Sequence, residues 1–135
     1  MKKIISLSLL LFSFTFAQAQ ITQYRTIKFA QASVYNGNYT WGDWERSNMD
    51  VYINWAALTM IIKSPSPQCY SFSENMSSYT DNQGAEIFKT FAIDQDGDRC
   101  HIRFRINKRE GYCQIYIDFN NVAWVYSVTK VRELQ

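Results

Sequence analysis

Three aspartates at alternate positions, Asp94, Asp96 and Asp98, lie close together in the segment AIDQDGDRCH. Clustered carboxylate oxygens are the ligands that hard cations such as Ca²⁺ prefer. A helix–loop–helix calcium loop needs Gly at its sixth position and Glu at its twelfth, but counting from Asp94 these positions hold Arg99 and Arg105. A looser hairpin calcium site therefore competes with a simpler interpretation, an Asp-Gly turn between two strands. Calcium is the only cofactor that the sequence indicates.

Polar side chains alternate with apolar ones just after these aspartates. His101, Arg103 and Arg105 share one face of a predicted strand, and Tyr116 lies opposite Arg103 on the next strand. A guanidinium offers a planar fork of donors that suits carboxylates and sugar hydroxyls, so these four residues are candidate ligand contacts. The alternative is a solvated outer sheet face on which the same side chains pair with one another.

Two tryptophans, Trp41 and Trp44, lie three residues apart near the end of a predicted strand. Aromatic rings at the edge of a loop stack on sugars or on protein partners, so both are candidate binding residues. The alternative is that the two rings plug one end of the hydrophobic core.

Enzyme chemistry has little support in the sequence. His101 is the only histidine, and its neighbour Cys100 points to the opposite face of the same strand, which argues against a thiol hydrolase. A serine triad would need His101 oriented by Asp118, but the sequence places no serine beside them and contains no G-x-S-x-G motif. A hydrolase using His101 and Asp118 is kept only as a third hypothesis.

The elements that must position these residues are predicted to be β-strands. Apolar and polar residues alternate repeatedly between short turns, as in antiparallel strands with one buried face. The strands are predicted near 24–35, 38–45, 49–55, 58–63, 69–74, 86–94, 99–106, 112–119 and 122–130, with Asn36-Gly37 as the strongest hairpin signal and 75–85 as the longest loop. This pattern predicts an all-β fold, an antiparallel meander of eight or nine strands that forms a small barrel or a two-layer sandwich. The architecture resembles lipocalin-like barrels, although no lipocalin motif is present.

Matching the faces of the last four strands gives a predicted register. The facing pairs are Asp94 with Arg99, Ala92 with His101, Thr90 with Arg103, Phe88 with Arg105, His101 with Asp118, Arg103 with Tyr116, Arg105 with Gln114, Asp118 with Ala123, Tyr116 with Val125, and Gln114 with Ser127. In this register Phe91 and Ile93 belong to the apolar face, together with Cys100.

Three cysteines, Cys69, Cys100 and Cys113, leave at least one thiol unpaired within the chain. Cys100 and Cys113 lie near opposite ends of their hairpin and so are beyond disulfide reach. A Cys69–Cys100 bridge is the one plausible disulfide. Three unpaired thiols, with Cys69 turned outward, are the favoured state.

Residues 1–19 have the features of a bacterial secretory signal peptide, with Lys2 and Lys3 before an apolar run and Ala17-Gln18-Ala19 at the cleavage site. We therefore predict one domain over 20–135 that is periplasmic or secreted, with no stable membrane insertion after cleavage. Without the two signal lysines, 12 of the 14 basic residues remain against 12 acidic ones. A neutral domain has no general electrostatic attraction to nucleic acid.

Together these features predict a non-enzymatic module that binds a small molecule or a glycan. The alternative is an envelope or secreted protein–protein interaction module, whose edge strand or 75–85 loop meets its partner. A pocket enclosed by the sheet would favour the first hypothesis. A filled core with an exposed aromatic patch would favour the second.

Overall fold

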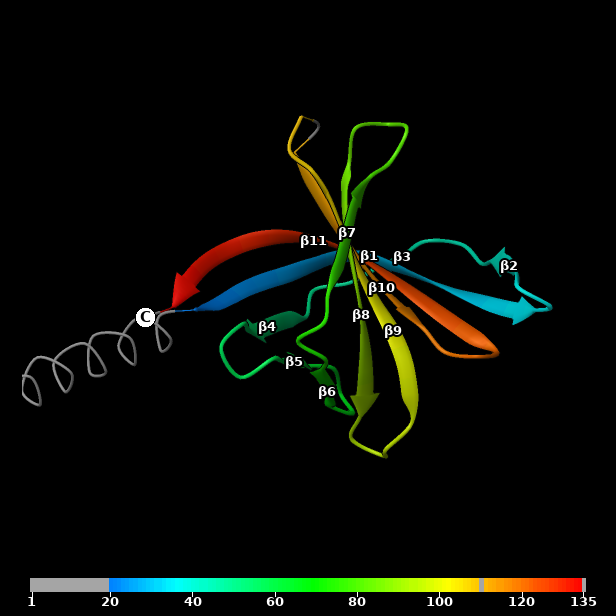
Figure 1. Cartoon of the computed structure of the whole chain (residues 1–135), viewed down its shortest axis with the longest axis horizontal. Coiled ribbons are helices and arrows are strands. Elements are labelled where there is room, and N and C mark those ends of the chain that lie inside the picture. Colours follow the sequence, from blue (N-terminus) through cyan, green and yellow to red (C-terminus); the bar gives the residue numbers. More distant parts are fainter. Residues whose placement is uncertain (1–19, 110, 135) are drawn as a thin grey trace, which may run out of the picture.

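A computed structural model describes residues 20–109 and 111–134, so the predicted signal peptide lies outside the described residues (Figure 1). The described chain forms eleven strands: β1 (Ile21–Tyr35), β2 (Asn38–Trp41), β3 (Glu45–Arg46), β4 (Asp50–Asn54), β5 (Thr59–Ile62), β6 (Gln68–Phe72), β7 (Ser77–Thr80), β8 (Glu86–Asp94), β9 (Arg99–Asn107), β10 (Tyr112–Asp118) and β11 (Val122–Leu134). Within the same ranges no helix has the length and apolarity needed to cross a membrane.

The predicted all-β fold is confirmed as an antiparallel barrel. Eight strands close in the order β11-β10-β9-β8-β6-β5-β4-β1, with β11 pairing back onto β1, and β2, β3 and β7 are additional strands at its edges. The sequence predicted neither the short strand β3 nor β7, which lies inside the expected 75–85 loop.

Strand β1 holds the barrel together because it pairs along both edges. One edge follows β11 through most of its length, and the other meets β4, β3 and β2 in turn. Its pairing with β11 shifts register between Gln23 and Tyr24 and again between Thr26 and Lys28. Such bulges bend a strand, which lets one strand serve several partners (Figure 1).

The barrel interior is filled with side chains. The largest completely buried residues are Ile53, Met60, Ile62, Ile102, Ile115, Ile117 and Val51, and none of them lines a described hollow. Trp55, Phe72 and Phe104 contact one another with ring centroids 5.5–6.4 Å apart. The described hollows therefore lie outside this group of seven residues.

The turn chemistry explains two of the hairpins. Asn36 and Gly37 both have positive φ, 51° and 77°, as the predicted two-residue turn between β1 and β2 requires. The weaker turn between β4 and β5 is stabilised by Asn54, whose Oδ1 accepts the backbone N–H groups of Ala56 and Ala57 at 3.1 and 2.9 Å.

The predicted register is confirmed for β9–β10 and β10–β11: His101 faces Asp118, and Asp118 faces Ala123. It is wrong by one residue for β8–β9, where Arg99 lies opposite Ile93 rather than Asp94, and His101 lies opposite Phe91.

The β8–β9 pairs predicted for Ala92, Thr90 and Phe88 shift in the same way. Ala92 faces Cys100, Thr90 faces Ile102 and Phe88 faces Phe104. Because the large ring of Phe72 is buried directly beside Ala92, β8 turns its small side chains inward there. Phe91 and Ile93 consequently face outward, against the prediction that they join the apolar face.

Candidate functional site

Backbone pairing places six residues in one row across the face of the sheet opposite the core, which we call the outer row. Its members, in order, are Trp41, Ala32, Ala123, Asp118, His101 and Phe91. Neighbouring strands lie about 4.8 Å apart, so the row spans roughly 24 Å. Aromatic rings lie at both ends, and a carboxylate and an imidazole lie near the centre.

The structure joins two predicted sites that are far apart in the sequence. The Trp41 side chain reaches across the small Ala32 and Ala123 to the ring of Tyr116, with centroids 6.1 Å apart and planes at 74°. Tyr39 stacks on Trp41 at 6.0 Å with planes only 7° apart. Trp41 and Tyr39 nevertheless stay 40% and 45% exposed. We call Tyr39, Trp41, Arg103, Tyr116 and Asp118 the outer cluster.

Arg103 and Asp118 fix the polar half of the outer cluster. Arg103 donates from Nε to Asp118 Oδ2 at 2.8 Å and from Nη2 to Oδ1 at 3.4 Å, and its guanidinium lies 4.4 Å from the centroid of the Tyr116 ring. Burial raises the pKa of Tyr39, and so does the Asp118 carboxylate, to which Tyr39 is hydrogen-bonded. The polar groups of the outer cluster therefore hold one another in place.

Arg105 lies in a separate network. Its Nε donates to Asp81 Oδ2 at 3.1 Å, its Nη2 donates to Gln83 Oε1 at 2.7 Å, and its Nη1 donates to the hydroxyl of Tyr112. Backbone N–H donation from Ala85, followed by the hydrogen bond from Arg105, lowers the pKa of Asp81. Arg105 therefore fastens the 75–85 segment to the sheet, and most of its donors are already used.

His101 and Asp118 face each other in the register, but their side-chain contacts lie elsewhere. Asp118 binds Arg103, while the imidazole of His101 packs on Phe91 with centroids 4.3 Å apart. Burial lowers the pKa of His101, and the neighbouring charge of Lys89 lowers it further. The arrangement offers a neutral, stacked imidazole more readily than a base oriented by a carboxylate.

Trp44 lies apart from the outer cluster, against a lysine. The ammonium of Lys28 is 4.5 Å from its ring centroid. Trp44 is about as exposed as Trp41, so neither tryptophan is buried as a plug of the core.

A hollow of about 710 Å³ opens beside Trp41 at the end of the barrel, and we call it the end hollow. Its lining residues are Gln31, Ala32, Ser33, Thr40, Trp41, Gly42, Asn121, Val122 and Trp124. A second hollow of about 590 Å³ adjoins it and shares Asn121, Val122 and Trp124. Trp124 is held between them by Phe119, edge to face at 5.7 Å.

The sequence reasoning did not single out the polar lining of the end hollow. A signal was present, because the positions that follow the inward Phe29 with a period of two are the polar Gln31 and Ser33. Polar residues at inward positions mark the point where a barrel core ends. Trp124, which lies opposite Gln31 on the same face, is only partly buried.

The carboxylates of Asp94, Asp96 and Asp98 do lie close together, within 4.8 Å of one another. However, Asp94 Oδ1 accepts the backbone N–H groups of Asp96 and Asp98, each at 2.9 Å. Gly97 has a φ of 83° between them. These bonds account for the cluster as a side-chain-stabilised turn.

The sulfur chemistry of the described residues is that of free thiols. Cys69 is exposed, Cys100 is buried and Cys113 is partly buried, and all three are unpaired. Burial raises the pKa of Cys100 to about 12 and that of Cys113 to about 11. Neither buried thiol has the lowered pKa of a nucleophile.

Comparison with known proteins finds no matching family model, no matching curated protein and no matching solved structure. The function is therefore argued from the geometry of the outer cluster and the end hollow.

Proposed function

We propose that this protein is an exported, non-enzymatic module, periplasmic or secreted, that binds a glycan in the end hollow. One observation carries the proposal: Trp124 and the uncharged polar residues Gln31, Ser33, Thr40 and Asn121 line a single hollow, and Trp41, whose ring lies on the other face of the sheet, borders it. This combination of flat apolar rings and neutral hydrogen-bonding groups matches a sugar better than it matches an ion.

The chemistry of a pyranose ring explains the match. Each face of the ring presents C–H groups, which pack on an indole, while its rim presents hydroxyls, which both donate and accept hydrogen bonds. Among the described residues, the side chains of Gln31, Ser33, Thr40 and Asn121 make no hydrogen bond to the protein. Their hydrogen-bonding capacity is thus available to a ligand.

The outer cluster supports the same proposal by holding Trp41 in place. The Trp41 ring is packed against Tyr39 and Tyr116, and Tyr116 is in turn covered by Arg103. A ring that is already ordered loses less conformational entropy on binding. Arg103 and Asp118 thus act as support for the binding ring in this proposal.

The test is a titration of a panel of soluble cello-, xylo-, chito- and malto-oligosaccharides by calorimetry. We expect at least one series to bind, and we expect Trp41→Ala to weaken that binding about tenfold, equivalent to about 1.4 kcal/mol. Gln31→Ala, at an exposed position, should also weaken it.

Tyr35→Ala is the matched control for these variants. It removes an aromatic ring that is 78% exposed on the same hairpin but lines no described hollow. No binding across the panel, or equal binding by Trp41→Ala and wild type, would reject the proposal. Thermal melts of each variant separate loss of binding from loss of folding.

A protein partner is the second candidate, because the core is filled and aromatic rings are exposed on the outer cluster. Among the strands of the described residues, β2 pairs only with β1, so within that part of the chain it has a free edge beside Trp41. A partner bound there would be released by Trp41→Ala but not by free oligosaccharide, whereas a glycan ligand would be displaced by its own soluble fragment.

A further inference from the structure

Strand β8 exposes the side chains that a barrel strand normally buries. Its small residues Thr90 and Ala92 face the core, while Phe91 and Ile93 face solvent with 61% and 49% of their surface exposed. A strand with its large apolar residues outward loses burial energy, and such departures from the expected pattern tend to occur at functional sites. Exposed apolar groups that lie together mark a binding surface.

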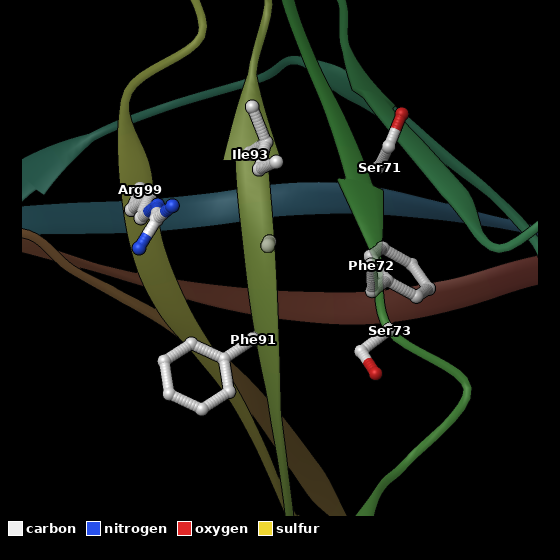
Figure 2. Close-up of a pocket in the computed structure, with 7 residues that line it drawn as sticks. Ser71, Phe72, Ser73, Phe91, Ile93 and Arg99 are labelled. Atoms are coloured by element: carbon white, nitrogen blue, oxygen red, sulfur yellow. The ribbon is translucent and has the colours of Figure 1, made fainter.

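A hollow of about 560 Å³ lies along this part of β8, between β6 and β9 (Figure 2). Figure 2 shows Phe91 and Arg99 on the β9 side of the β8 ribbon, and Ser71 and Ser73 on the β6 side. Ser71, Ile93 and Arg99 belong to one row, because Ile93 pairs with Ser71 on one side and with Arg99 on the other. We call Ser71, Phe91, Ile93 and Arg99 the β8 patch.

The β8 patch carries a cation without a partner. The Arg99 side chain is exposed and makes no hydrogen bond, ion pair or ring contact with any described residue, whereas Arg103 and Arg105 on the same strand are both paired with aspartates. Asp94, which was predicted to pair with Arg99, instead uses its Oδ1 in the turn. The guanidinium thus has its donors free for an anionic ligand.

The size of the patch favours a small ligand over a protein. Phe91 and Ile93 together expose roughly 200 Å² of apolar surface, given the area of such side chains. A stable protein interface needs about 800 Å² on each partner. The hollow volume of about 560 Å³, by contrast, lies within the range of about 300–1,000 Å³ found for small-molecule sites.

We propose that the β8 patch binds the anion of an aliphatic carboxylic acid, with the carboxylate on Arg99 and the hydrocarbon chain along Ile93 and Phe91. Ile93 lies directly opposite Arg99, and Phe91 lies two residues before Ile93 on β8, about 7 Å away. The Phe91 ring is steadied by its contact with His101. Ser71 lies on the other side of Ile93 from Arg99 and borders the hollow there. The hollow of the β8 patch shares no lining residue with the end hollow, and this proposal does not depend on glycan binding.

The probe is decanoate, titrated by calorimetry below its micelle concentration, with decyltrimethylammonium as a chain of similar length and opposite charge. Arg99→Gln and Phe91→Ser should each weaken decanoate binding about tenfold. Both residues are exposed, so neither change should lower the melting temperature appreciably. Decyltrimethylammonium should bind wild type much more weakly than decanoate.

Three controls keep this test specific. Lys89→Gln removes a neighbouring exposed cation that does not line the hollow, Tyr35→Ala removes an exposed ring elsewhere, and Trp41→Ala alters the end hollow. All three should bind decanoate like wild type. Absence of decanoate binding, binding unchanged by Arg99→Gln and Phe91→Ser, or equal binding of the cationic chain would each overturn the proposal.

Discussion

Replacing Arg105 with glutamine should loosen the 75–85 segment, which the backbone pairing of β7 with β8 still holds to the sheet. The Arg105 side chain is only 13% exposed, and it donates hydrogen bonds to Asp81, Gln83 and Tyr112. Hydrogen bonds to charged groups contribute roughly 1.5–3 kcal/mol in mutational studies. Because Gln can keep one of the three bonds, and because Asp81 can regain water, we expect Arg105→Gln to lower the free energy of unfolding by about 2 kcal/mol.

Thermal unfolding followed by circular dichroism measures this effect, since a domain of this size loses roughly 4 °C in melting temperature per kcal/mol, or about 8 °C here. Arg25→Gln is the matched control, because it breaks the Arg25–Asp50 ion pair, which has a similar length of 3.2 Å but lies at 47% and 36% exposure. Such exposed pairs contribute about 0–1 kcal/mol. Amide hydrogen exchange should also speed up over β7 in Arg105→Gln alone. If Arg105→Gln and Arg25→Gln lower the free energy of unfolding by the same amount, the contacts of Arg105 do not stabilise the 75–85 segment as proposed.

Three further predictions concern the thiols and the aspartate turn. Because burial raises the pKa of Cys113 from its ordinary 9.0 to about 11, its stabilising effect is complete below pH 9 and is lost as the pH rises toward 11. Denaturant titrations should show this decline, and Cys113→Ala should reduce it without abolishing it, because burial also raises the pKa of Cys100. Maleimide should rapidly label one thiol per molecule in the native protein, and peptide mapping should identify the labelled residue as the exposed Cys69. Fast labelling of Cys100 would contradict the inward orientation of that side chain. Asp94→Ala should lower the free energy of unfolding by about 1 kcal/mol because it removes the acceptor of two N–H groups. Asp94→Asn keeps Oδ1 and should lower it by less than about 0.5 kcal/mol. A calcium-dependent rise in melting temperature that Asp94→Asn abolishes would instead establish the calcium site.

The sequence was sufficient to predict the register wherever inward residues were apolar on both strands. Ile102, Ile115 and Ile117 alternate with charged or polar residues, so an alignment of β9 with β10 that is shifted by one residue would not bury them on a common face, and the short turn between the strands limits larger shifts. The same logic failed on β8, where inward packing is decided by Tyr70 and Phe72 on the neighbouring β6. That neighbour is separated from β8 by the 75–85 segment, and alternation within β8 carries no information about it.

The candidate site was predictable in its parts but not in its assembly. Aromatic and basic residues were identifiable by type, yet the contact between Trp41 and Tyr116 depends on two alanines on strands that lie between them. The sequence also could not predict that Arg103 and Arg105 bind different partners. They occupy equivalent positions on β9, and only their surroundings pair one with Asp118 and the other with Asp81.

Closure of the barrel through β1 and β11 has a consequence for how this chain folds. Pairing of Ile21 with Leu134 joins the earliest and the latest described strands, so the contact with the largest sequence separation is also the one that seals the sheet. Until β11 has been synthesised, the long edge of β1 has no partner there, and loop closure of this length is slow. We therefore expect the slow last step of refolding to be the pairing of β1 with β11. We also expect the unpaired edge of β1 to be the part of the nascent chain that most needs a chaperone.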